Sequence, residues 1–256
     1  MAAHTPDAAV EDAALRVEPG AKRVRALFGG EVVADTTAPR LVWEKPHYPT
    51  YYFPAGDVRS RLLVDTGDTR GRPAGTARVL DVHAGGRTAP GAAQRFDDSP
   101  VTLLAGTVRL SWQAMDAWFE EDEEVYVHPR DPYTRVDVLQ SSRHVRVEVD
   151  GVTVAETRQP RMLFETGLPP RFYLPKTDVR LDLLAPTDTE TRCPYKGTAS
   201  YYAVRGGEGR RDDLAWWYQH PTLEAAKIAG YVCFYDERVD TYVDGELRPR
   251  PESPFS

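Results

Sequence analysis

The stretch from Val145 to Leu184 reads VRVEVDGVTVAETRQPRMLFETGLPPRFYLPKTDVRLDLL. The stretch from Val24 to Leu63 reads VRALFGGEVVADTTAPRLVWEKPHYPTYYFPAGDVRSRLL and aligns with it without a gap, at a constant offset of 121 residues. The two stretches are identical at 17 of 40 positions, which is far above chance. Such internal similarity indicates gene duplication, so the sequence predicts that one fold is built twice.

Each copy opens with the pattern of a β-hairpin. In the second copy, apolar and charged residues alternate over 145–149, Asp150-Gly151 follows, and another apolar run begins at Val152. Alternation with a period of two is typical of a strand that buries one face, and Asp-Gly is a favoured two-residue hairpin turn. Gly29-Gly30 takes the position of this turn in the first copy.

The rest of the pattern is mostly strand as well. Further strands are expected over 201–204, 231–235 and 241–243, and short helices over 221–228 and 111–124. We therefore expect a mainly β protein, made of two tandem domains of antiparallel strands that each carry a short helix.

The repeat also sets the expected domain boundaries. We expect a flexible N-terminal tail at 1–14, a first repeat domain at 15–140 and a second at 141–256, with the boundary near 139–143. Beyond the 40-residue block the match resumes at Thr69 and Thr191, one residue out of step. The segment 84–93, rich in Gly, Ala and Pro, predicts a surface loop in the first copy. We expect the two repeats to pack on each other as a pseudo-dimer.

Composition excludes several functional classes. The chain has 256 residues, of which 41% are hydrophobic and 28% charged, a balance typical of globular proteins. Its net charge of -7 argues against a nucleic-acid partner, because phosphate binding needs a basic face. No apolar run reaches the roughly 18 residues of a membrane span, and residues 1–14 lack the apolar core of a signal peptide. We therefore expect a cytoplasmic protein without a membrane partner.

The strongest local signal for chemistry is the run 191–197, which reads TRCPYKG. A cysteine becomes a nucleophile when a nearby cation stabilises its thiolate, so Cys193 and Lys196 are candidate catalytic residues. The alternative is that Cys193 is a buried structural residue, as free cysteines often are. The first copy has TRGRPAGTA at 69–77 in this place, without the cysteine or the lysine. We therefore expect either that the second copy holds the working site or that the two copies hold divergent sites.

Two further clusters combine aromatic and ionisable residues. The run 215–221 reads AWWYQHP and is either an aromatic wall, with His220 as a proton-transfer group, or part of the core. Glu44 and Glu165 stand at equivalent positions of the two copies, and they either anchor a ligand or pair with an arginine to hold a loop. The arginines retained near them are Arg40, Arg161, Arg59 and Arg180. The chain has no Cys-x-x-Cys pair or phosphate-binding loop, so no metal or cofactor is expected.

The T-x-C-P-Y-K-G motif, with Y-x-P-x-x-D-V upstream, resembles a family catalogued as domain of unknown function 427. The matching residues are Tyr173, Pro175, Asp178, Val179, Thr191, Cys193 to Gly197, Trp217, Tyr218 and Pro221. The resemblance covers the chain from about residue 15, more loosely in the first half, and it implies a β-tent of two splayed antiparallel sheets. The nucleotidyltransferase label that this family sometimes carries finds no support, because such transfer needs metal-holding carboxylates and phosphate-binding groups.

The sequence leads to three expectations about function, and it does not decide whether the protein is an enzyme. The first is a binding module that holds a small apolar or aromatic molecule in a cleft of the second repeat. The residues expected to line this cleft are Tyr173, Tyr195, Lys196, Tyr202 and Trp217. The alternatives are a thiol-dependent enzyme that uses Cys193, and a scaffold for protein interaction.

Overall fold

The computed structural model describes residues 15–207 and 209–253, so the tail expected at 1–14 lies outside the described residues. The chain divides into two compact units, Met1–Asp131 and Pro132–Ser256. This boundary falls before the expected residues 139–143. The reason is strand pairing, because β12 (Val136–Gln140) runs antiparallel to β15 (Arg161–Glu165) and so belongs to the second unit.

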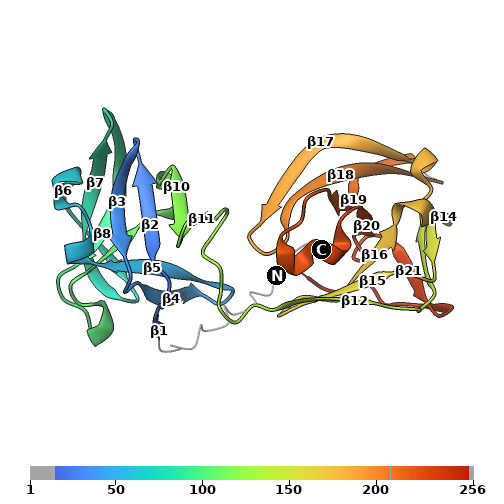
Figure 1. Ribbon diagram of the computed structural model, residues 1–256, viewed down its shortest axis with the longest axis horizontal. Coiled ribbons are helices and arrows are strands. Elements are labelled where there is room, and N and C mark those ends of the chain that lie inside the picture. Colours follow the sequence, from blue (N-terminus) through green and yellow to red (C-terminus); the bar gives the residue numbers. More distant parts are fainter. Residues whose placement is uncertain (1–14, 208, 254–256) are drawn as a thin grey trace, which may run out of the picture. The chain divides into compact units, whose positions relative to one another are not determined.

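The first unit contains a seven-stranded and a four-stranded sheet, and the paired strands in both are antiparallel (Figure 1). In hydrogen-bonded order, the larger sheet consists of β1 (Arg16–Pro19), β4 (Arg40–Lys45), β5 (Tyr48–Pro54), β9 (Thr107–Leu110), β8 (Arg87–Phe96), β7 (Gly75–Ala84) and β6 (Leu63–Arg72). The smaller sheet consists of β11 (Glu123–Glu124), β10 (Ala117–Glu120), β2 (Val24–Phe28) and β3 (Glu31–Thr36).

The second unit repeats this topology strand for strand. Its larger sheet is β12, β15, β16 (Arg171–Pro175), β20 (Tyr231–Phe234), β19 (Gly209–Tyr218), β18 (Gly197–Gly206) and β17 (Leu184–Cys193). Its smaller sheet is β14 (Val152–Thr157), β13 (Val145–Val149), β21 (Asp240–Val243) and β22 (Glu246–Leu247). The predicted mainly β fold and its duplication are confirmed.

The helices among the described residues are short 3-10 turns. They are η1 (Ala55–Asp57), η2 (Ser60–Leu62), η3 (Thr102–Leu104), η4 (Trp112–Ala114), η5 (Lys176–Asp178), η6 (Leu181–Leu183) and η7 (Leu223–Ile228). The helix expected over 221–228 is present as η7. The one expected over 111–124 is wrong, because this segment contains only η4 and then continues as β10 and β11. Every second residue of β10 is buried, namely Trp118 and Glu120. This period of two residues is typical of a strand.

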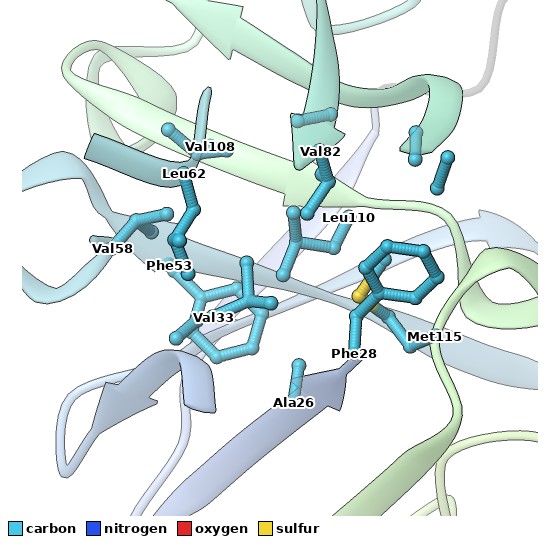
Figure 2. Close-up of a cluster of buried hydrophobic side chains, with 14 of the residues drawn as sticks. Ala26, Phe28, Val33, Phe53, Val58, Leu62, Val82, Val108, Leu110 and Met115 are labelled. Atoms are coloured by element: carbon cyan, nitrogen blue, oxygen red, sulfur yellow. The ribbon is translucent and has the colours of Figure 1, made fainter. Parts of the chain in front are cut away.

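The core of the first unit lies between its two sheets (Figure 2). Figure 2 shows side chains of the smaller sheet, such as Phe28 and Val33, pointing toward Phe53, Val82 and Leu110 of the larger sheet. The second unit has a matching core of valines and other apolar residues between its sheets. Each larger sheet also packs apolar residues on its other face, so its central strands are buried on both sides.

The predicted hairpin of the second copy is present as β13 and β14, and its turn residues Asp150 and Gly151 have φ values of 51° and 76°. In the first unit, Gly29 in the β2–β3 turn lies against Gly85 in the β7–β8 turn. A Cβ on either glycine would come closer than 3.0 Å to backbone of the other hairpin turn. The close approach of these two turns therefore requires glycine at both positions.

Segment 84–93 is not the surface loop that its composition predicted. It contains the turn Gly85-Gly86 and the first half of β8, which pairs with β7. The strand accommodates Pro90 and Gly91 at a bulge, where the pairing shifts between Leu80 and Val82. Backbone pairing with a central strand outweighs the low strand propensity of Gly, Ala and Pro here.

Candidate functional site

The motif at 191–197 forms the turn between β17 and β18. Cys193 ends β17 and pairs with Gly197, so Pro194, Tyr195 and Lys196 form the turn itself. In the first unit Arg72 pairs with Gly75, which leaves a turn of two residues. The additional residue of the second copy therefore lies in the turn.

This pairing corrects the alignment of the cysteine. The offset of 121 persists to the end of β6 and β17, so Cys193 corresponds to Arg72 rather than to Gly71. The sequence alone places the change of offset before Thr69. The reason is that Thr69-Arg70 and Thr191-Arg192 are identical pairs at an offset of 122, one residue more than the offset of the 40-residue block. The strand pairing shows the register that the backbone adopts.

The turn is held against the chain that leads into η7. Thr222 donates a hydrogen bond from its hydroxyl to the carbonyl oxygen of Tyr195 at 2.5 Å, and from its amide to that of Lys196 at 3.2 Å. Gly197 has a φ of 99°, and a Cβ there would lie 3.1 Å from the carbonyl oxygen of His220. Gly197 and Thr222 therefore serve the packing of this turn.

Lys196 forms an ion pair with Glu165 at the end of β15. The side chains of Lys196 and Glu165 are 13% and 9% exposed, so the pair is largely removed from water. Removing one member of such a pair leaves the other charge uncompensated. Because Glu165 neutralises the ammonium group, Lys196 stabilises a thiolate at Cys193 less than the sequence suggested.

Glu44, the counterpart of Glu165, is neutralised by a different cation. Arg109 donates from Nε and from Nη2, each 3.1 Å from a Glu44 oxygen, and the Tyr52 hydroxyl donates at 2.6 Å. Burial would raise the pKa of Glu44, but the hydrogen bond from Tyr52 and the charge of Arg109 hold it below its usual value. Arg40, one of the expected partners, lies on the same strand four residues away, a separation of about 13 Å along an extended chain.

The two copies thus supply their cations from different strands. Tyr52 pairs with Arg109 across β5 and β9, and Tyr173 pairs with Cys233 across β16 and β20. Cys233 therefore stands where the first copy has Arg109, and its side chain is fully buried. Lys196, in the longer turn, supplies the missing charge. The carboxylate is common to both repeats, whereas the cation has changed position.

The five residues expected to line a cleft do not lie on one face of the sheet. Tyr173 is only 1% exposed and accepts a hydrogen bond from Nε1 of Trp216 at 3.1 Å, within the cluster on the outer face. Tyr202 and Trp217 stack with 6.3 Å between ring centroids on the opposite face, beside the core between the sheets. Lys176 lies over Trp217, with Nζ 3.0 Å from the ring centroid.

Neighbouring residues of a strand point to opposite faces, and this separates the members of the aromatic cluster. Trp216 is buried in the cluster on the outer face, which agrees with the interpretation of this run as part of the core. Trp217 lies on the opposite face. His220 is exposed beyond the end of β19. Of the expected cleft, only Tyr195 and Lys196 remain in the turn that begins at Cys193.

A buried ionic cluster in the second unit was missed by sequence reasoning. Arg171 donates from Nη1 and Nη2 to the two carboxylate oxygens of Glu237, at 2.7 and 2.6 Å. The Asp236 carboxylate lies 3.8 Å from Arg171 and accepts a hydrogen bond from the Thr241 hydroxyl at 2.6 Å. Ser253 also donates to Glu237. Arg171 and Glu237 are 66 residues apart, so no local spacing indicates the pair.

The pKa of Asp236 predicts a dependence of stability on pH. Burial raises this pKa to about 6, although Thr241 and Arg171 act in the other direction. Unfolded aspartate has a pKa of about 3.9, so the folded state holds this proton more tightly. The contribution of this proton to the free energy of unfolding is therefore fully present below about pH 4, and it is lost as the pH rises through about 6.

We expect Asp236→Asn to remove this dependence. Relative to the wild type, the variant should gain roughly 2–3 kcal/mol in the free energy of unfolding between pH 4 and pH 7, from a pKa shift of about two units. Urea unfolding at several pH values measures the difference between the two proteins. A difference that stays constant over this range would contradict the assignment.

No group of three or more His, Cys, Asp or Glu side chains within 15–207 and 209–253 is arranged to hold a metal ion. No helix in the same residues is long and apolar enough to span a membrane. A comparison with curated proteins finds no match. A family model described as a domain of unknown function, number 427, matches residues 16–121 and again 137–245. These two matches coincide with the two structural repeats, and the chain is therefore a tandem two-copy member of the domain of unknown function 427 family.

Proposed function

We propose that the second repeat binds a small, mostly apolar or aromatic molecule beside the turn that carries Cys193 and Lys196. The observation that carries this proposal is Tyr218, the last residue of β19. Its side chain is 4% exposed, yet its hydroxyl has no hydrogen-bond partner among the described residues. The hydroxyl oxygen is not among the fully buried side-chain atoms that lack a partner, so it keeps some contact with solvent. A hydrogen bond from it to a ligand would contribute about 0.5–1.5 kcal/mol.

The surroundings of Tyr218 support a ligand that is apolar apart from one acceptor group. Burial raises the pKa of Tyr218, and charge on Cys193 and Glu165 adds to this, so the phenol stays protonated and acts as a donor. Apolar and aromatic side chains of the same cluster, including Tyr201 and Ile228, pack on this face of the sheet. An aromatic ketone or aldehyde has the required combination of a ring and an acceptor.

Acetophenone is a suitable probe, followed in ¹H–¹⁵N spectra of the full chain. We expect shift changes at residues 191–197 and 216–222, and a Tyr218→Phe variant that binds about fivefold more weakly because one hydrogen bond is lost. Tyr202→Phe is the matched control, since this tyrosine lies on the opposite face of the same sheet. Equal effects of the two substitutions, or shifts confined to other regions, would exclude the proposal.

The thiol-dependent alternative is supported less well. Cys193 is half-buried, but Glu165 neutralises Lys196, and His220 is exposed beyond the end of β19. Alkylation of Cys193 by iodoacetamide faster than that of a model thiol would favour the enzyme over the binding module. The scaffold alternative, with the repeats packed as a pseudo-dimer, remains a prediction.

A further inference from the structure

The first repeat has a cavity of about 90 Å³ in which hydrogen-bond donors lie beside aromatic rings. It is lined by Tyr48 of β5, Arg109 of β9 and Trp112 of η4, with Glu44 and His128 among the other lining residues. The rings of Tyr48 and His128 are stacked at 3.9 Å between centroids, and those of Trp112 and Trp118 at 4.6 Å. Both aromatic stacks therefore contribute flat rings to the lining of the cavity.

Three donor groups of residues that line the cavity have no hydrogen-bond partner among residues 15–207 and 209–253. Arg109 uses Nε and Nη2 for Glu44, which leaves the N–H groups of Nη1. The indole Nε1 of Trp112 and the hydroxyl of Tyr48 are likewise without a partner. Glu44, the carboxylate in the lining, already accepts hydrogen bonds from Arg109, Tyr52 and Thr50.

The charge balance of the cavity also favours an anion. Arg109 compensates Glu44, and the exposed Lys45 at the rim adds a positive charge. An arginine that is anchored by a carboxylate on one side presents its remaining N–H groups in a fixed geometry, which suits a carboxylate ligand.

We propose that this cavity binds the carboxylate of a small aromatic acid, with the ring packed on Trp112 and Tyr48. The volume limits how much of such a ligand enters, since about 90 Å³ is less than the roughly 150 Å³ that encloses benzene. The cavity therefore takes the carboxylate and part of the ring, while the rest of the molecule extends outward. This site is distinct from the one proposed in the second repeat, and the two repeats recognise different chemistry.

The second copy lacks the residues that build this cavity. Arg109 is replaced by Cys233, and Thr50, which donates to Glu44, is replaced by the buried Arg171. Arg171 is held by Glu237 instead, and no tryptophan follows β20. The duplication therefore produced one repeat with an arginine and indole at this position and one with an internal ion cluster.

Titration of the full chain with benzoate and with benzamide tests the proposal. The two probes have the same ring and nearly the same shape, but only benzoate is charged. In ¹H–¹⁵N spectra we expect benzoate to shift the Trp112 indole N–H and the amides of residues 44–51 and 109–113, with at least tenfold tighter binding than benzamide. Equal binding of the two probes, or benzoate shifts confined to residues 191–197, would overturn the proposal.

Variants separate this site from the one in the second repeat. Trp112→Phe keeps an aromatic wall and removes the indole donor, so benzoate binding should weaken about fivefold. Trp217→Phe, in the second repeat, should leave benzoate binding unchanged, and so should Tyr218→Phe. If Tyr218→Phe weakens benzoate binding and Trp112→Phe does not, the cavity of the first repeat is not the site. Loss of acetophenone binding in Tyr218→Phe is a separate result that bears only on the second repeat.

Discussion

Arg171→Met is expected to lower the free energy of unfolding of the second repeat by about 3–5 kcal/mol. The guanidinium is buried and makes two short hydrogen bonds to Glu237, with Asp236 3.8 Å away. Without it, the buried Glu237 loses its bidentate partner and Asp236 loses the charge of Arg171, and a buried unpaired charge is among the most destabilising changes that a substitution can cause. The bidentate contact also holds the pKa of Glu237 below its usual value.

Urea unfolding of the full chain, followed by hydrogen exchange in peptides from β16 and β20, measures this loss in the correct repeat. Arg180→Met is the matched control, because Arg180 pairs with Asp182 on the surface, where both side chains are more than half exposed. Exposed pairs of this kind contribute little. A double variant, Arg171→Met with Glu237→Met, should recover much of the loss, since apolar pairs can replace buried ion pairs. An Arg171→Met protein as stable as the Arg180→Met protein would show that the cluster is not a structural necessity.

Gly85→Ala is expected to destabilise the first repeat much more than Gly86→Ala, although the two glycines are neighbours in the same turn. Both have positive φ, 55° and 73°, so each alanine costs about 1–2 kcal/mol for the left-handed conformation. At Gly86 nothing lies within 4 Å of the added Cβ. At Gly85 the Cβ meets the carbonyl group of Gly29, which forces the two hairpin turns apart and adds about 1–3 kcal/mol.

Both variants carry the same cost of placing alanine in the left-handed conformation. The difference between their free energies of unfolding therefore gives the contribution of the contact between the two turns. Thermal and urea unfolding of both proteins measure it, and hydrogen exchange at the β2–β3 turn reports whether this contact has opened. The second repeat has the same approach of turns, where a Cβ on Gly207 would lie 2.8 Å from the carbonyl oxygen of Asp150. If both alanine variants lose the same stability, the contact between the turns adds nothing to the fold.

The duplication makes each repeat a control for the other. Glu44 and Glu165 are retained together with Tyr52 and Tyr173 beside them, so this part of the site belongs to the common fold. The cations differ, and so do the residues around them. The divergent groups are therefore where the two proposed sites differ, and the two proposals can be tested independently.

The sequence by itself determined the duplication, the strand-rich fold, the β13–β14 hairpin and the family. These features depend on local signals, namely period-two alternation, an Asp-Gly turn and identity at constant spacing, which are visible without knowledge of contacts. Two local signals misled, at 84–93 and 111–124, because pairing with neighbouring strands outweighed the composition of each segment.

The tertiary structure alone decided which charges meet and which face each aromatic residue takes. Lys196 reaches Glu165 across 31 residues and Arg109 reaches Glu44 across 65, because antiparallel pairing brings distant strands side by side. Tyr202 and Trp217 were separated from Tyr173 by the pleat, since a change of one position along a strand moves a side chain to the other face of the sheet. Register and long-range pairing, which no local spacing records, therefore built both candidate sites.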